Sequence, residues 1–343
     1  MEKTNQKILF SQVNISSQTF TEKIVSGNKY VNYGEDNKYP DYLWELYVNS
    51  SIHQAIIDGT RDYIIGEGIV TTRQDKKKIE KLAKSIAFDL VTFGGFAIEI
   101  VYNMIGEIVK VNYLDFMKCR TNKDLTKVYY SNEWGQWRSD AIEYDVFNPE
   151  AEKKTAQIYY YRGDRTRSVY PIPHYVGSTQ AIETSIEIQS YHLNAIRNNF
   201  AASAIINFIG EPTEEEKAAI ESGISTKFTG TTNASRFMLA FNADKDSAVT
   251  IERLESDTAD EKFIQLQKDT KESIFVGHRV TSPSLFGMLP ESGGFNSTEY
   301  QESFAIYNKT VIQPLQAEIS EALYDIYGEE ITFAPFEIPT FNA

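Results

Sequence analysis

The pattern of apolar and polar positions switches along the chain between helical periods and short strand-like runs. Apolar side chains at helical spacing, with charges on the opposite face, predict helices over residues 39–47, 50–65, 75–93, 180–202 and 257–275. Apolar or alternating runs between turn residues predict strands at residues 96–102, 107–114, 127–130, 142–146, 157–162, 204–209, 237–241 and 249–254. Helices followed by a β-rich section, and then by helices again, predict an α+β fold. Residues 1–40 carry few apolar pairs and are expected to form an irregular arm.

Residues 257–326 are predicted to form two helices joined by a glycine-rich loop. Pro283 cannot continue the first helix, and the adjacent glycines Gly293 and Gly294 permit backbone angles that other residues avoid. Asn296, with Glu299 three residues later, is a capping-box start for one long second helix. Apolar residues at helical spacing follow in that helix: Phe304, Tyr307, Val311, Leu315, Leu323 and Ile326. This arrangement is typical of a mechanical element rather than a catalytic one.

Composition and charge restrict the class of protein. The chain has 343 residues, of which 41% are hydrophobic, enough for one large core or two modest ones. Its formal net charge is −14, whereas proteins that hold nucleic acid tightly neutralise phosphates with clustered lysine and arginine. A single cysteine, Cys119, excludes an internal disulfide and suits a reducing compartment. Residues 1–12 lack the apolar core of a signal peptide and no stretch is long enough for a membrane span, which predicts a soluble cytoplasmic protein.

The sequence offers no catalytic or cofactor-binding motif. It lacks a Walker-type phosphate loop, and residues 293–298, which could present backbone amides to an anion, lack the lysine of such a loop. The four histidines, His53, His174, His192 and His278, are scattered without metal-ligand spacing. We therefore expect no catalytic residue, no metal and no cofactor.

The order and spacing of several segments resemble the portal proteins of tailed bacteriophages, in particular the HK97-type or PBSX-like portal family. The earliest is the run at residues 89–100, which looks like part of the family's wing. The others lie between residues 177 and 327: a long helix ending at 198–202, the apolar strand 204–208, the acidic helix from 213, the strand at 236–239, the helix from 260, the turn 279–287, and the helix through 296–304 and 310–319. The resemblance covers most of the chain, and its clearest departure is the short C-terminus after Tyr327.

The resemblance implies a ring-forming α+β portal fold with an α/β wing, a two-helix stem, a small α/β clip, a tunnel loop and a C-terminal helix. The implied parts are an N-terminal arm (1–40), wing (41–179), first stem helix (180–203), clip (204–254), second stem helix (255–280), tunnel-loop region (281–297), and a C-terminal wing helix with a short or absent crown (298–343). It also implies a homo-oligomer, a dodecamer, at one vertex of the capsid in the virion, assembled in the cytoplasm of a bacterial host. Its partners would be the major capsid protein, the terminase large subunit, a head–tail adaptor and double-stranded DNA that passes without sequence recognition.

Candidate site residues follow from that resemblance. The tunnel loop would contain Met288, Leu289, Glu291, Gly293, Gly294 and Phe295. Acidic stem residues expected to line the channel are Glu255, Asp257, Asp260, Glu261 and Asp269, with Lys262, Lys268 and Lys271 bridging neighbouring subunits or forming a weak contact ring. Clip contacts are expected at Glu214, Glu215, Phe228 and Phe237.

Two alternatives stay open at this point. A metal-dependent enzyme that processes nucleic acid would need two or three carboxylates converging in one cleft, which the sequence does not signal. Another phage structural protein, such as a head–tail adaptor or baseplate component, would usually be shorter or richer in β-structure.

Overall fold

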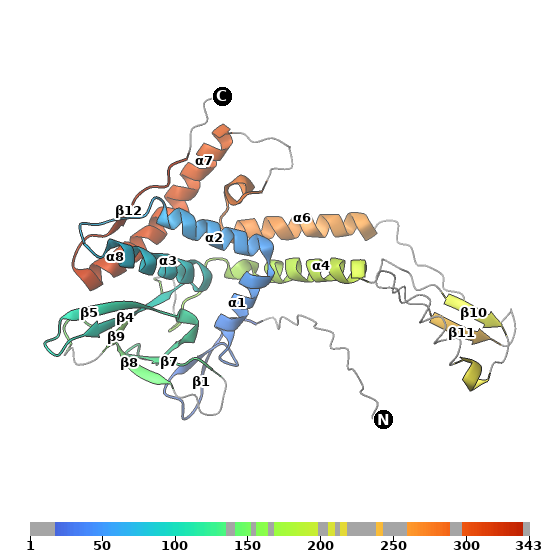
Figure 1. Cartoon of the computed structure of the whole chain (residues 1–343), viewed down its shortest axis with the longest axis horizontal. Coiled ribbons are helices and arrows are strands. Elements are labelled where there is room, and N and C mark those ends of the chain that lie inside the picture. Colours follow the sequence, from blue (N-terminus) through green and yellow to red (C-terminus); the bar gives the residue numbers. More distant parts are fainter. Residues whose placement is uncertain are drawn as a thin grey trace. The chain divides into compact units, whose positions relative to one another are not determined.

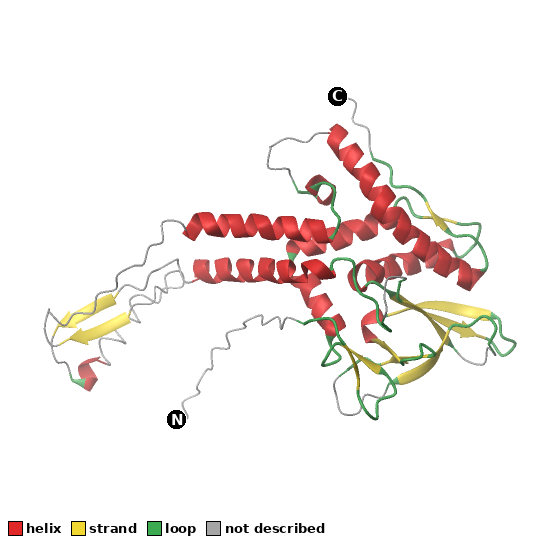
Figure 2. Cartoon of the chain, turned by 180° about the vertical axis from the view of Figure 1, so that it is seen from behind, coloured by secondary structure: helices red, strands yellow, loops and turns green. Residues whose placement is uncertain are grey.

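The computed structural model divides the chain into two compact units, one of Met1–Glu183 with Thr270–Ala343 and the other of Thr184–Asp269. The structure describes residues 18–134, 141–151, 156–163, 168–197, 205–209, 213–217, 238–242, 259–288 and 297–338. In the larger unit, helices gather on one side of a six-stranded sheet (Figures 1 and 2). The expected α+β class is therefore confirmed.

Three helices open the larger unit: α1 (Tyr39–Asn49), α2 (Ser51–Ile65) and α3 (Lys76–Phe93). Each was predicted to within about two residues. Ser50 ends α1 and caps α2, where its hydroxyl accepts a hydrogen bond from the His53 amide at 3.4 Å. Helix α3 buries the apolar stripe read from the sequence and ends at Gly94, whose φ of +82° is left-handed. Helix α3 packs directly on the sheet, and α1 and α2 pack against α3.

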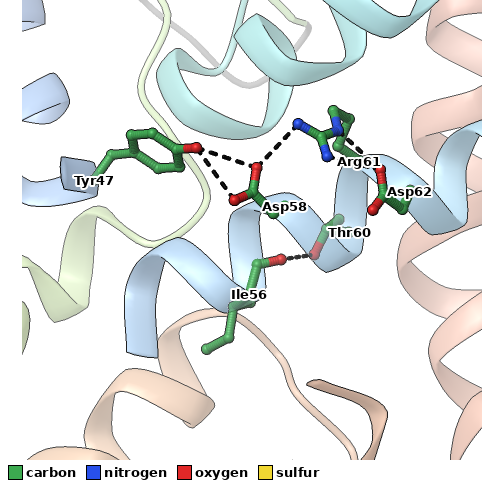
Figure 3. Close-up of polar contacts among 6 residues, drawn as sticks. All are labelled: Tyr47, Ile56, Asp58, Thr60, Arg61 and Asp62. Atoms are coloured by element: carbon green, nitrogen blue, oxygen red, sulfur yellow. Dashed lines mark hydrogen bonds and ion pairs between the residues drawn. The ribbon is translucent and has the colours of Figure 1, made fainter. Parts of the chain in front are cut away.

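Partly buried polar contacts join α1 to α2 and connect side chains along α2 (Figure 3). The Tyr47 hydroxyl lies 3.1 and 3.2 Å from the two carboxylate oxygens of Asp58. Arg61 donates to Asp58 at 3.0 Å and to Asp62 at 2.8 Å. The Arg61 side chain is 31% exposed, so these pairs contribute little to stability.

The six-stranded sheet has the strand order β5-β4-β9-β8-β7-β6. Its strands are β4 (Phe96–Tyr102), β5 (Ile108–Leu114), β6 (Cys119–Thr121), β7 (Lys127–Tyr130), β8 (Ile142–Val146) and β9 (Gln157–Tyr161). Neighbouring strands are antiparallel except β8 and β9, which are parallel over two residue pairs. Helix α3 packs on β4 and β5, so Ile98 and Ile100 are completely buried. The end strand β5 is the most exposed of the long strands.

The prediction of an irregular arm over residues 1–40 is wrong within the described residues. Strands β1 (Glu22–Ile24) and β2 (Val31–Tyr33) form an antiparallel hairpin. The hairpin is held by tertiary contacts, because the Tyr33 ring stacks on Tyr170 at 4.1 Å and its hydroxyl donates to the Pro171 carbonyl at 2.8 Å. Such distant partners leave no local signal in a polar stretch of sequence.

A completely buried arginine connects this hairpin to the sheet. Arg120 of β6 donates to the side-chain oxygen of Asn37 at 2.6 Å and to the Asn37 carbonyl at 2.7 Å. It also donates to the carbonyls of Met117 and Cys119 at 2.7 and 2.8 Å. Burial lowers the Arg120 pKa, yet the four acceptors keep the guanidinium satisfied. Asn37 needs that support because its φ is +65°.

The last helix is not continuous as predicted. Helix α7 (Ser297–Tyr307) passes through a π-helical segment, η4 (Asn308–Ile312), into α8 (Gln313–Tyr327). Pro314 has no amide hydrogen for the carbonyl four residues earlier, that of Thr310, and Arg279 donates to this carbonyl instead at 2.9 Å. The wider turn shifts the phase of the helix, so Ile312 is fully buried while the predicted Val311 is half-exposed. The short strand β12 (Thr332–Phe333) then pairs with β3 (Ile69–Val70).

The start of helix α4 (Thr179–Arg197) meets the end of helix α6 (Ala259–Gly277) in the larger unit. The residues that form this tight contact, Ser178, Ser273 and Gly277, are called the root of the two helices below. The Ser178 hydroxyl, in the 3-10 turn η2 (Val176–Ser178), donates to the Ser273 carbonyl at 2.8 Å. A side chain added at Gly277 would place its Cβ 1.9 Å from the Ser178 hydroxyl oxygen. Only glycine allows this approach, so the backbone of α6 packs directly against the Ser178 side chain.

Two histidines that are far apart in the sequence meet beside this root. His53 Nδ1 lies 2.8 Å from His278 Nε2, and the Tyr175 ring stacks on His278. Burial lowers the pKa of His53, and burial with the nearby His174 lowers the pKa of His278 to about 3. Both rings are therefore neutral at pH 7, with one nitrogen donating to the other. The expectation that the histidines are scattered fails for this pair.

Replacing Arg120 with methionine should lower the free energy of unfolding by about 3 to 5 kcal/mol, because four acceptors lose their donor in a buried site. Urea denaturation followed by tryptophan fluorescence measures this, since Trp44, Trp134 and Trp137 all belong to the larger unit. Arg61→Met is the matched control and should cost less than about 1 kcal/mol. Equal losses for the two variants would contradict the role given to Arg120.

Stability should fall as the pH drops from 6.5 toward 3, because the unfolded chain protonates His278 in that range and the folded chain does not. Between pH 7 and pH 5 the His278 contribution is about 2 kcal/mol of unfolding free energy. The variant His278→Gln should therefore show a shallower loss of stability with acid than the wild type in tryptophan-detected denaturation. His192→Gln, in the smaller unit, should keep the wild-type slope. Parallel pH profiles for all three proteins would refute the assignment.

Candidate functional site

The paired helices α4 and α6 are the element on which the candidate residues lie (Figure 1). In the smaller unit they contact each other through rings, with Phe263 5.5 Å from Tyr191 and 4.7 Å from His192. Phe263 belongs to the apolar stripe read from the sequence of α6, whereas Tyr191 and His192 lie off the apolar stripe of α4.

Several large apolar side chains of this helix pair are exposed. Tyr191 is 63% exposed and Ile264 is 66% exposed. Leu193 and Leu266, both expected on the buried stripes, are 47% and 44% exposed. When two helices pack together, each buries only one face against the other, so these residues remain uncovered in the single chain. Covering exposed apolar side chains of this size with another molecule would be favourable, because it removes apolar surface from water.

The acidic residues expected to line a channel belong to α6 or precede it. Asp269 is exposed and accepts a hydrogen bond from Gln265 at 2.6 Å. Asp260 and Glu261 lie in the first turn of α6, a position where the helix dipole generally stabilises negative charge. Glu255 and Asp257 lie outside the described residues.

The lysines of α6 have separate environments. Lys271 lies over the Phe275 ring, with its ammonium 5.6 Å from the ring centre. Lys268 is exposed, and only the backbone of Lys262 is described. An intrachain cation–π contact at Lys271 leaves its charge at the surface, where a carboxylate of another molecule could reach it.

Within the larger unit, α1 supports the start of α4. The Tyr42 hydroxyl donates to a carboxylate oxygen of Glu183 at 2.7 Å. Burial, and then this carboxylate, raise the pKa of Tyr42, so the phenol remains protonated and keeps the bond. The two residues lie 141 positions apart, so the sequence alone gives no sign of this contact.

The segment after α6 is tied to the core until shortly before the expected loop. The turn η3 (Pro283–Phe286) buries Leu285 and Phe286, and the Tyr63 hydroxyl donates to the Leu285 carbonyl at 2.5 Å. Met288 is half-buried. The other loop candidates, Leu289, Glu291, Gly293, Gly294 and Phe295, lie outside the described residues, and α7 starts at Ser297. The loop candidates thus follow a buried turn and precede a helix whose first residues, Ser297, Thr298 and Glu299, are exposed.

The smaller unit contains a parallel pair of strands, β10 (Ile205–Ile209) and β11 (Met238–Asn242). Helical residues 214–217 carry the candidates Glu214 and Glu215, both exposed. Thr213 and Glu216 form a capping box, in which the Glu216 carboxylate accepts from the Thr213 amide at 2.9 Å; this bond lowers the Glu216 pKa. Glu214 pairs with Lys217 at 2.7 Å, whereas Phe228 and Phe237 lie outside the described residues.

The described residues lack two kinds of feature. No group of three or more histidine, cysteine, aspartate or glutamate side chains in that part of the chain is placed to hold a metal ion. None of the described helices combines the length and the hydropathy that crossing a membrane requires.

The chain is similar to known portal and neck proteins along most of its length. A "Probable portal protein" of Haemophilus phage HP1 (strain HP1c1) is 22% identical over 329 residues, which are 90% of this chain and 89% of the relative. Among solved structures, a chain from the neck of an empty gene transfer agent (GTA) particle, computed with C6 symmetry, matches with a TM-score of 0.54 and 15% identity; the match covers 86% of this chain and 84% of that one. A chain from the neck of the native GTA particle, computed with C12 symmetry, matches with a TM-score of 0.51 and 14% identity over 85% and 83%.

The sequence model of the family described as phage portal protein matches residues 76–334, about three quarters of the chain. The match extends from α3 through the sheet, both long helices and α8 to the strand β12. It confirms the resemblance read from residues 89–100 and 177–327. The chain therefore belongs to the phage portal protein family.

Proposed function

We propose that twelve copies of this chain form a ring at one vertex of the capsid, and that double-stranded DNA enters and leaves through the centre of the ring. The observation that carries this proposal is the family match over residues 76–334, which includes both long helices. The C12 symmetry reported for the neck of the GTA particle supports the number of copies.

The exposed apolar residues of α4 and α6 support assembly. Tyr191, Leu193, Ile264 and Leu266 are uncovered in the single chain, although burying each would release apolar surface from water. A neighbouring copy that presents the same pair of helices is a suitable cover. In a closed ring each subunit uses two different faces, so every copy is covered in the same way.

The net negative charge of the chain, −14, suits a channel through which DNA passes. Duplex DNA carries about one negative charge per 1.7 Å of its axis, and each lysine or arginine paired with a phosphate adds grip. An inner wall of carboxylates repels the duplex and keeps it centred. Asp269 is exposed on α6, and we assign it to this wall with Asp260, Glu261, Glu255 and Asp257. Lys262, Lys268 and Lys271 would then meet carboxylates of the next subunit or form a weak contact ring.

The remaining parts of the chain are assigned to partners. The smaller unit, with Glu214, Glu215, Phe228 and Phe237, would act as the clip that docks the terminase large subunit during packaging and the head–tail adaptor afterwards. The sheet and helices of the larger unit would form the wing against the major capsid protein. The energy for DNA movement would come from the terminase, so the chain itself needs no catalytic residue, metal or cofactor.

Electron microscopy and native mass spectrometry of the purified chain test the ring. We expect closed particles of twelve subunits with a central hole wide enough for a double helix, and with α6 carboxylates such as Asp269 on its wall. Substituting Leu266 and Ile264 with glutamate should reduce the fraction of rings. A monomer that cleaves DNA when a divalent metal is added would refute the proposal, and so would a ring with a uniformly basic wall.

A second test concerns the loop that contains Gly293 and Gly294. Replacing both with valine should impair DNA packaging while rings still assemble, because the loop loses backbone conformations that only glycine reaches easily. The readout is the fraction of filled capsids in a phage that carries the variant gene. Gly177→Val is the control, since a side chain at Gly177 meets no atom within 4 Å, and it should package normally. Normal packaging by the double variant would contradict a moving loop.

A further inference from the structure

A groove in the larger unit is lined by none of the candidate residues named above. It has a volume of about 720 Å³, and its walls are the first turns of α3, β5 from Ile108 to Tyr113 and the end of α8. In Figure 1, β5 forms the outer edge of the sheet next to α3 and α8. The functional assignments above do not use this groove.

One wall of the groove is an open strand edge. β5 stands at the end of the six-strand order and pairs only with β4 in the part of the chain that the structure describes. Its seven residues, IVKVNYL, include no proline or glycine and offer about 23 Å of edge with unpaired backbone groups. Ile108, Val109 and Tyr113 on this strand are exposed, Val109 by 60%. Natural edge strands of this length are usually shielded by proline, bulges or charge, or are covered by another chain.

The opposite wall of the groove is basic, although the chain as a whole has a net charge of −14. Lys78 and Lys81 line the groove from α3, and Lys110 lines it from β5. All three are exposed, and none forms an ion pair with another described residue. Arg73 also lines the groove, but it is already paired with Asp75 at 2.9 Å and with Glu329 at 3.2 Å. Two uncompensated positive charges on α3 therefore lie across the groove from β5, and a third lies on β5 itself.

The chemistry of the groove identifies its occupant. An extended backbone can pair with the free edge of β5, as in strand addition, and apolar lining residues such as Leu82, Val111 and Ile326 can accept alternate side chains. Carboxylates on the occupant would meet the lysines. Duplex DNA fits less well, because its phosphates make no use of a strand edge or of apolar lining, and DNA sites display larger clusters of lysine and arginine.

We propose that this groove binds an extended acidic segment of a partner protein, which adds to the sheet as a seventh strand beside β5. The carboxylates of that segment pair with Lys78, Lys81 and Lys110, and its backbone pairs with the β5 edge. The proposal goes beyond the assignment as a channel subunit and does not depend on it. A chain of this fold that conducts no DNA would carry the same groove.

Fluorescence anisotropy on the full-length chain tests the proposal with defined probes. The first probe is a fluorescein-labelled octapeptide that alternates glutamate and valine; the others are its lysine–valine counterpart, an N-methylated glutamate–valine peptide and a 20-base-pair DNA duplex. We expect binding of the first probe only, because N-methylation removes the backbone donors that a strand edge requires. Binding of the N-methylated peptide with equal affinity would overturn strand addition, and binding of the duplex alone would assign the groove to DNA instead.

Charge-reversal variants locate the site. Lys78→Glu with Lys81→Glu should weaken binding of the acidic peptide about tenfold or more, through two lost attractions and two new repulsions. Lys76→Glu with Lys77→Glu is the matched control, because these exposed lysines on the same helix turn do not line the groove and change the net charge equally. The control should bind within about twofold of the wild type, as expected for weakly coupled surface charges. Equal weakening in both double variants would show a general charge effect and overturn the site.

Discussion

The contact between Ser178 and Gly277 is the constraint on which the geometry of the long helices depends. At this point α6 ends and the 3-10 turn before α4 begins, and the missing side chain of Gly277 lets the Ser178 hydroxyl approach. The hydroxyl donates to the Ser273 carbonyl one turn earlier in α6. A hydrogen bond that requires a glycine opposite it fixes both the distance and the rotation of the two helices at their root. The same root is where a force on the helices would reach the sheet.

Polar contacts between residues distant in the sequence surround this root, from the buried histidine pair to an exposed contact of Arg279. His278 meets His53, Tyr42 meets Glu183, and Arg279 supplies the donor that Pro314 cannot give to Thr310. Burying polar groups without partners is costly, so these contacts allow few alternative arrangements of the helices. The start of α4 and the end of α6 are thereby fixed to the helices of the larger unit.

The exposed surfaces of the chain differ in character. The helix pair of the smaller unit exposes apolar residues such as Tyr191 and Ile264, which a like surface on another copy can cover. The groove beside β5 instead combines a strand edge with unpaired lysines, a combination that suits an extended segment of opposite charge. Surfaces with such different chemistry can be occupied at the same time by different partners.

The sequence by itself determined most helices and strands, because amphipathic period and turn residues are local properties: α3 and the β4–β5 hairpin agree with their predictions. The family resemblance was also readable from the order of segments. Only the tertiary structure decided the β1–β2 hairpin, the burial of Arg120 and the meeting of His53 with His278, since each depends on contacts between residues more than 80 positions apart. The break at η4 lies between these cases. The sequence shows that Pro314 cannot donate a backbone hydrogen bond. Only the tertiary structure shows that Arg279 donates to the Thr310 carbonyl instead, at the wide turn.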